Sequence, residues 1–310
     1  MNTLSTSDLF NKLPANTCAG YRALRETPSA NSQLCRTYCE YLWERFRPYA
    51  DRDFVQDFAV HLHQRFWEMY LGVTLLEAGH SIMAPKPGPD FGIIHGGKKI
   101  WIEAVTATAG EPGRPDSIPV YELKEGEIEA GRVPQDQIVL RCTAAISAKF
   151  PKQYRQHAAS GIIGPDDCYI VAVNHAEAYR WAEVGTPPFI LRAVLGVGPL
   201  FVTIDKKTLE IVSQGAHYRG SIPKSSGASV DTALFLSPES DLLSAVIGSV
   251  TTIGTPVHLQ QDEHAMGQDF LLVRNPMARN RIPPDILVRG QQFDVSFSDN
   301  EYQVTGRPPG

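Results

Sequence analysis

The 310-residue chain lacks a long uninterrupted hydrophobic segment. An apolar stretch at residues 189–204 is broken by Arg192, two glycines and Pro199, whereas a membrane helix needs roughly 18 or more consecutive apolar residues. The polar N-terminal segment has no apolar core of the kind found in secretory signals. We therefore expect a cytoplasmic protein with no membrane partner.

Cysteine is scarce, and the number of cysteines, five, is odd. A disulfide framework is therefore not expected. Cys35 and Cys39 share one helical face, but no further ligands with the spacing of a metal site follow nearby. We interpret both as buried small side chains. His61 and His63 are two residues apart, so they do not share a helical face and do not predict a metal pair.

Positive charge is in the minority, with 29 Lys and Arg against 34 Asp and Glu, a net charge of −5. A protein that binds nucleic acid by charge alone is usually basic overall, so any such contact would come from a local patch. The 43% hydrophobic and 20% charged residues are ordinary for a globular chain and exclude collagen-like, coiled-coil and disordered classes.

Several familiar catalytic motifs are absent, among them HExxH, paired CxxC and the Gly-x-Ser-x-Gly elbow. Residues Gly92 to Lys98 have the glycine and lysine spacing of a phosphate-binding loop. However, Lys99 stands where that loop requires Ser or Thr, and the segment predicts strand–turn–strand instead of strand–loop–helix. We do not expect nucleotide binding there.

The hydrophobic pattern of the first half predicts helices and a hairpin. An apolar stripe predicts one long helix over residues 53–78, ending at Gly79. Gly96 and Gly97 predict a tight turn between strands at 90–95 and 99–106. A second helical pattern covers residues 137–159 and is kinked or restarted at Pro151. A buried strand is predicted at residues 168–174.

The second half is predicted to be mostly β, and residues from about 291 onwards form a polar tail that we expect to be loose. The expected organisation is a partly helical N-terminal arm (1–50), one mixed domain (51–290) and the tail (291–310). The segment 244–250 fits a strand or a helix equally well. Further strands are expected at 80–83, 189–195, 200–204, 209–212, 233–236 and 270–273, with a hairpin turn at 205–208.

Two acidic residues lie on the neighbouring strands of the predicted hairpin. Asp90 opens the first strand, and Glu103 lies among apolar residues of the second, where a carboxylate is costly to bury unless it is paired or bound to metal. Two adjacent carboxylates resist ionisation unless a cation lies between them. Oxygen ligands suit Mg²⁺, which can activate water and stabilise a leaving oxygen. Alternatively, Asp90 caps a turn and Glu103 pairs with a nearby Lys or Arg.

Pro89-Asp90, followed thirteen residues later by Glu103-Ala104-Val105, resembles the signature of the PD-(D/E)XK nuclease superfamily. The preceding helix and the following helix and strand are also similar to its αβββαβ core, over about residues 53–175. The resemblance implies an α/β fold with a restriction-endonuclease-like core, a β-rich C-terminal extension and a helical N-terminal arm.

The resemblance also implies roles for individual residues. Asp90 and Glu103 would bind Mg²⁺, with Mn²⁺ as a substitute, and the Ala104 carbonyl is a candidate third ligand. Glu68, on the preceding helix, matches a carboxylate that contacts the metal through water in many members. The lysine expected two residues after the second acid, which in this superfamily orients the attacking water and offsets charge on the phosphate, is Val105 here.

Some members supply this charge from the following helix. Arg141, Lys149 and Lys152 fall within roughly 80° of one another on a continuous helix. We interpret Lys149 as the displaced lysine and Arg141 as a contact to substrate phosphate; the alternative is an ordinary solvated basic face. Lys98 and Lys99 lie about 13 Å or more from Glu103 along the strand and are interpreted as surface charges.

The resemblance thus predicts a metal-dependent endonuclease that hydrolyses phosphodiester bonds of nucleic acid, with double-stranded DNA as the expected substrate. Restriction, repair or defence is the setting that this analogy suggests. A homodimer is one expectation, with the aromatic stretch 38–49 either serving as its interface or covering the core. Two alternatives are a catalytically inactive relative that binds nucleic acid or a protein partner, and an unrelated α/β interaction protein with structural acids.

Overall fold

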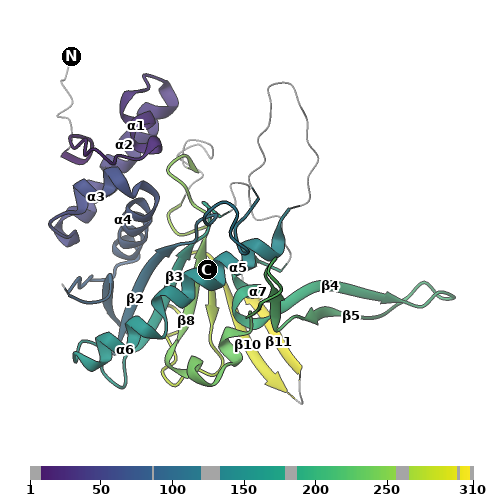
Figure 1. Cartoon of the computed structure of the whole chain (residues 1–310). Coiled ribbons are helices and arrows are strands. Elements are labelled where there is room, and N and C mark those ends of the chain that lie inside the picture. The colour runs from purple at the N-terminus through teal and green to yellow at the C-terminus, as the bar shows by residue number, and fades with distance from the viewer. Residues whose placement is uncertain are drawn as a thin grey trace, which may run out of the picture.

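The computed structural model describes residues 8–85, 87–119, 133–178, 187–255, 265–298 and 301–307. A seven-stranded mixed sheet lies at the centre, in the order β1-β2-β3-β8-β9-β10-β11, and helices cover both of its faces (Figure 1). The predicted mixed α/β class is therefore confirmed. The helices are α1 (Ala19–Glu26), α2 (Ala30–Phe46), α3 (Phe54–Val60), α4 (Leu62–Glu77), α5 (Gln135–Lys149), α6 (Lys152–Ala159) and α7 (Phe189–Leu195).

The strands of the central sheet are β1 (Phe91–His95), β2 (Lys98–Thr106), β3 (Cys168–Asn174), β8 (Ala245–Ser249), β9 (Leu271–Arg274), β10 (Gln291–Ser298) and β11 (Glu301–Arg307). Two small antiparallel pairs accompany it, β4 (Val197–Ile204) with β5 (Ile211–Tyr218) and β6 (Ser221–Pro223) with β7 (Ser229–Asp231). Short 3₁₀ turns lie at Asp8–Phe10, Arg47–Tyr49, Leu234–Leu236 and Pro238–Leu242.

The hairpin of β1 and β2 forms one edge of the sheet, as predicted. Gly96 and Gly97 connect the strands with φ of 56° and 75°, backbone angles that glycine adopts without steric cost. The segment is strand–turn–strand, unlike a phosphate-binding loop. On its other side β2 runs parallel to β3, with Glu103 opposite Val171.

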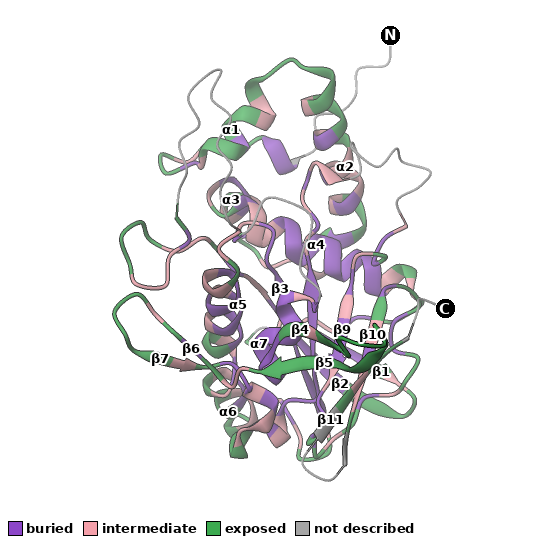
Figure 2. Ribbon diagram, turned by 90° about the vertical axis from the view of Figure 1, so that its right-hand side faces the viewer, coloured by how far each residue is buried: buried purple, intermediate pink, exposed green. Residues whose placement is uncertain are grey.

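Side chains of β2 alternate between two hydrophobic layers, as the pleat requires. Ile102 and Ala104 belong to the layer formed with α1–α4, while Trp101 belongs to the layer formed with α5–α7. Figure 2 shows both layers as buried on either side of the sheet. Glu103 follows Ile102 in the strand, so its side chain faces the α5 layer.

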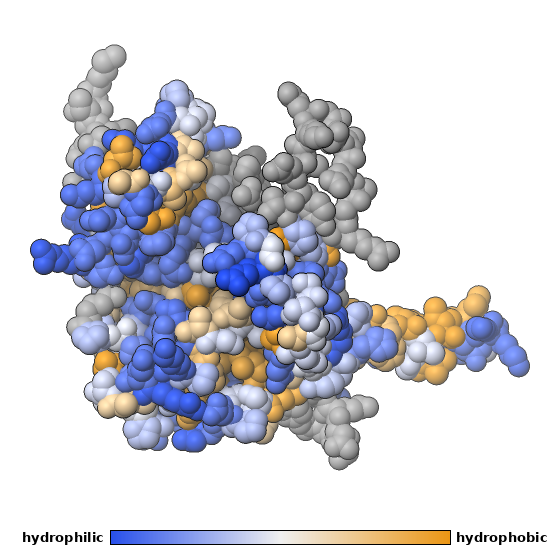
Figure 3. Space-filling view, viewed as in Figure 1, coloured by the Kyte–Doolittle hydropathy of each residue, from blue (hydrophilic) through white to orange (hydrophobic). Residues whose placement is uncertain are grey.

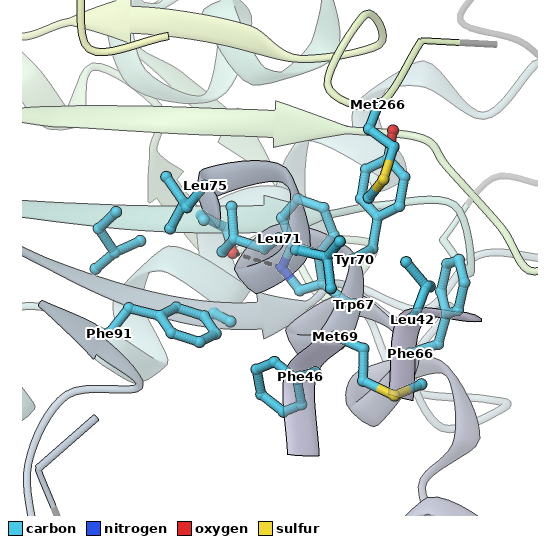
Figure 4. Packing of buried hydrophobic residues seen from close by; sticks show 14 of the residues in the cluster. Leu42, Phe46, Phe66, Trp67, Met69, Tyr70, Leu71, Leu75, Phe91 and Met266 are labelled. Atoms are coloured by element: carbon cyan, nitrogen blue, oxygen red, sulfur yellow. Dashed lines mark hydrogen bonds between the residues drawn. The ribbon is translucent and has the colours of Figure 1, made fainter. Parts of the chain in front are cut away.

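Helix α4 anchors the first layer because nearly its whole circumference is buried. Trp67 is fully buried and its Nε1 donates a hydrogen bond to the Ala172 carbonyl of β3 at 3.0 Å (Figure 4). Phe46 at the end of α2 is buried beside Phe91 of β1, with ring centroids 6.0 Å apart. The aromatic stretch of the N-terminal arm thus covers the core.

Residues 53–78 were predicted as one continuous helix, and this prediction was wrong because the segment forms two helices. The chain breaks at His61, where φ is −119° and ψ is 53°, and forms α3 and α4 instead. The second helical pattern was predicted correctly, since it divides at Phe150 and Pro151 into α5 and α6.

Three other predictions were wrong. The segment Phe189–Leu195 is helix α7 instead of a strand, and its end at Gly196, in the left-handed conformation with φ 64°, is a common helix terminus. The segment 233–236 forms a 3₁₀ turn at Leu234–Leu236. The described residues of the polar tail are not loose, since 291–298 and 301–307 form β10 and β11 at the end of the sheet.

The remaining predictions were mostly correct. Strands appear near 168–174, 200–204 and 270–273, and the undecided segment 244–250 contains strand β8. The turn at 205–208 is present, with Asp205 accepting hydrogen bonds from the amides of Lys207 and Thr208. The expected strand at 80–83 is reduced to a single bridge between Met83 and Gly92. All five cysteines are free thiols, and Cys35 and Cys39 are buried.

No helix in the described part of the chain has both the length and the apolar character needed to cross a membrane.

Candidate active site

The structure brings Asp90, Glu103 and Lys149 together at the edge of the sheet. Asp90 immediately precedes β1, and its Oδ2 accepts a hydrogen bond from the Ala104 amide of β2 at 2.8 Å. Lys149, the last residue of α5, places its Nζ 3.0 Å from Oε2 of Glu103 and 3.9 Å from Oδ2 of Asp90. One ammonium therefore lies beside both predicted metal ligands.

This cluster is buried at its base and open at its rim. The Glu103 side chain is 3% exposed, whereas those of Asp90 and Lys149 are each 20% exposed. Solvent therefore reaches the cluster through Asp90 and Lys149. A narrow cleft beside it is lined by Phe46, Tyr49, Ala50, Asp51, Phe54, Glu68, Asp90 and Phe91.

His157 of α6 also contacts Glu103, a contact that the sequence pattern does not predict. Its Nε2 lies 3.1 Å from Oε1 of Glu103, so an ionised Glu103 accepts a hydrogen bond from the Nε2–H tautomer. Burial and the charge of Lys149 lower the pKa of His157, which favours the neutral ring. The only signal for this contact in the sequence was a histidine eight residues after Lys149. Pro151 lies between them, so helical periodicity could not predict which side of the segment His157 faces.

Glu68 lies on α4, in the layer opposite Glu103. Its Oε2 accepts a hydrogen bond from Arg65 at 2.7 Å and its Oε1 accepts one from Gln64 at 3.1 Å. Gln64 also donates to the Ala104 carbonyl at 3.2 Å. Both Glu68 oxygens and the candidate carbonyl ligand thus already have hydrogen-bond partners. Gln64 and Arg65 stand one helical turn before Glu68, a spacing at which contacts are expected.

The acids of the cluster have perturbed pKa values. Burial, and after it the charge of Asp90, raise the pKa of Glu103 to about 7, because Lys149 offsets only part of their effect. Burial and Asp90 likewise raise the pKa of Glu68. Burial alone would lower the pKa of Lys149, but the charges of Asp90 and Glu103 reverse the direction and raise it. Strongly shifted groups at an open edge are typical of functional sites.

The other predicted basic residue, Arg141, lies outside this cluster. Its guanidinium pairs with Asp116 at 3.1 Å and donates to the Thr108 carbonyl at 2.8 Å. A role in binding substrate phosphate would require Arg141 to exchange these partners. Lys152 is exposed, and Arg155 pairs with the exposed Glu239.

The donor atoms of the cluster suit a hard cation. Within the described ranges, no group of three or more His, Cys, Asp or Glu side chains is placed to hold a metal ion. Two carboxylates that face one positive charge do match Mg²⁺, which typically binds one or two carboxylates and completes its shell with water and phosphate. The residues therefore fit Mg²⁺ better than a metal that needs a complete protein cage.

No known protein family matches the chain, and neither a characterised protein nor a solved structure shows significant similarity to it.

The raised pKa of Glu103 predicts how stability depends on pH. Because the folded state holds the Glu103 proton up to about pH 7 and the unfolded state releases it near pH 4.5, the free energy of unfolding should fall as pH rises through this window. The loss should be on the order of 2–3 kcal/mol. Urea unfolding at pH 5 and pH 8 measures it.

The matched control for this measurement is Glu103→Gln, which cannot titrate. Its unfolding free energy should change less between the two pH values than that of the wild type. Equal pH dependence in both proteins would show that Glu103 does not hold its proton in the folded state.

Proposed function

We propose that the chain is a Mg²⁺-dependent nuclease that hydrolyses phosphodiester bonds of nucleic acid, with double-stranded DNA as the substrate. The observation that carries this proposal is the convergence of Asp90, Glu103 and Lys149 at an open edge of the sheet. Paired carboxylates beside an ammonium offer both a cation site and a positive group for phosphate.

The order of elements around the cluster supports a core of PD-(D/E)XK type. Helix α4 is followed by the bridge at Met83, the hairpin β1–β2, helices α5 and α6, and strand β3, which runs parallel to β2. This order is consistent with αβββαβ if the Met83 bridge stands for the first strand and α5 with α6 for the second helix. The resemblance predicted this order from the sequence, and we propose this core for residues 53–175.

Asp90 and Glu103 would hold the ion. When bound, Mg²⁺ would supply Lewis-acid activation of water and neutralisation of charge on the leaving oxygen. Glu103 is fixed for this role because His157 contacts one of its oxygens and Lys149 the other. Asp90 is fixed by the Ala104 amide.

Lys149 would take the place of the motif lysine, whose position in the sequence is occupied by Val105. The Lys149 side chain is partly exposed at the rim, where a phosphate oxygen could reach it once a cation takes over the neutralisation of the carboxylates. A fixed positive group that faces developing charge is among the strongest contributions to catalysis. Glu68, held by Gln64 and Arg65, would act on the ion through water.

A specific observation favours a second candidate, an inactive relative that binds nucleic acid or a protein. Lys149 and His157 already satisfy both oxygens of Glu103, so the cluster is stable as a purely structural ion pair. Such a protein would bind DNA without cutting it.

Cleavage of plasmid and linear DNA tests the proposal. The wild type should cut with Mg²⁺ or Mn²⁺, lose activity on addition of EDTA, and lose it in Asp90→Asn because the ion is then held by one carboxylate. The matched control is Asp285→Asn, which removes an exposed carboxylate near the other end of β1, where it pairs with His95. DNA binding without metal-dependent cutting would support the inactive relative, and neither binding nor cutting would refute both.

A further inference from the structure

The pair of strands β4 and β5 projects from the body of the molecule as a two-stranded ribbon (Figure 1). All residues of β5 are exposed, and in β4 only Val197 and Gly198, at its start, are buried. An isolated two-stranded hairpin is at best marginally stable in water. A ribbon of this kind therefore needs additional contacts to be held in one conformation.

One face of the ribbon is apolar. Antiparallel partners share a face, which brings together the pairs Leu200 with Ala216, Val202 with Gln214, and Ile204 with Ile211. The side chains of Leu200, Val202, Ile204 and Ile211 are 52–62% exposed. Figure 3 shows apolar atoms along the ribbon and hydrophilic atoms at its tip. The opposite face contains Thr203 paired with Ser213 and Phe201 paired with Gly215, and it is more polar, with Phe201 as its one large apolar side chain.

A contiguous exposed aliphatic surface is more often a site of contact with another molecule than a surface that stays in contact with water. The charge of the ribbon indicates which partner it fits. Residues 197–218 carry two acids, Asp205 and Glu210, and two lysines, Lys206 and Lys207, all at the tip. The net charge of the ribbon is thus zero and its apolar face carries no charge. Nucleic acid requires a surplus of positive charge, which the ribbon lacks.

A two-fold contact between identical chains requires a surface that is complementary to itself. An apolar face without charge meets this requirement, and so does a tip with equal numbers of both signs. We propose that the apolar face of the β4–β5 ribbon is the interface between two copies of this chain, with the two ribbons stacked face to face. This contact is independent of the proposed nuclease activity.

The oligomeric state of the full chain tests this interface. Sedimentation equilibrium of the wild type at micromolar concentration should give twice the chain mass of 34.2 kDa. In Val202→Asp, two carboxylates would face each other in the apolar contact, so the dissociation constant should rise at least about tenfold. The control Ile94→Asp places the same charge at another exposed aliphatic residue, 63% exposed, and should leave the dimer intact.

Cross-linking provides a second measurement that does not depend on disrupting the ribbon. Gln214 lies at the middle of the apolar face and Ser213 on the opposite face. Under mild oxidation Gln214→Cys should form a covalent dimer much faster than Ser213→Cys.

Three outcomes would overturn the proposal: a monomeric wild type, a dimer that Val202→Asp leaves unchanged, or equal cross-linking at both positions. Loss of DNA binding in a monomeric Val202→Asp, with a monomeric wild type, would assign the ribbon to nucleic acid instead.

Discussion

Lys149→Ala should reduce metal-dependent cleavage by roughly 10²–10³-fold, the loss typical when one fixed group that stabilises developing charge is removed. The reason is the position of Nζ, 3.0 Å from Glu103 and 3.9 Å from Asp90, at the point where phosphate would approach the bound ion. Initial rates of plasmid nicking at saturating Mg²⁺ measure the effect. Lys152→Ala, which removes an exposed lysine three residues further on, should cut at the wild-type rate.

The same substitution should affect metal binding in the opposite direction. In the wild type the ammonium would compete with the proposed cation for the two carboxylates, so Lys149→Ala should bind Mn²⁺ at least as tightly as the wild type. Calorimetric titration measures this affinity. Full cleavage activity in Lys149→Ala would remove the lysine from the mechanism, whereas loss of both cleavage and Mn²⁺ binding would indicate a structural role alone.

Stability provides a third readout for Lys149→Ala. Without metal, two carboxylates lose their nearest cation, and about 2 kcal/mol of unfolding free energy should be lost; the value is below the roughly 3–5 kcal/mol of a fully buried pair because Lys149 is partly exposed. Addition of Mg²⁺ should restore more stability in this variant than in the wild type, since a ligand that binds only the folded state stabilises it.

The hairpin and the helix that hold the candidate site could be predicted from the sequence, because the turn residues and the hydrophobic periodicity of these segments indicate the same elements. Gly96 and Gly97 between two alternating strands define the hairpin, and the hairpin alone is enough to bring Asp90 close to the strand of Glu103. The position of Lys149 could be predicted from helical periodicity because residues 135–149 form one uninterrupted helix. The position of His157 could not be predicted in this way, since a second helix begins after Pro151 and its direction depends on tertiary packing.

The wrong predictions have separate physical causes. Phe189–Leu195 is apolar except for Arg192, and so short an apolar run does not distinguish a buried strand from a buried helix. Pro188 before it and Gly196 after it were the signals for a helix. In β10, Phe293, Val295 and Phe297 alternate with polar residues, and this strand pattern was obscured by the polar composition of the tail. The break at His61 follows no glycine or proline, so no local sequence signal marks it.

Arg65→Ala should lower the free energy of unfolding by about 3 kcal/mol, the low end of the range for breaking a buried ion pair. Arg65 contacts three carboxylates, those of Asp51, Asp57 and Glu68, at 3.2, 2.5 and 2.7 Å. Its side chain is 17% exposed and that of Glu68 is 9% exposed, so removal of the guanidinium leaves a buried acid that Gln64 alone cannot compensate. Urea unfolding at pH 7.5 measures the change.

Two further variants show whether the loss comes from Glu68. The double variant Arg65→Ala, Glu68→Gln should recover part of the lost stability, because the uncompensated charge is then absent; no recovery would place the effect in the pairs with Asp51 and Asp57. Arg155→Ala, which breaks the exposed pair with Glu239, should cost less than about 1 kcal/mol. If Arg65→Ala were equally mild, Glu68 would not depend on Arg65 for its burial beside Asp90, and it could contact the proposed cation directly.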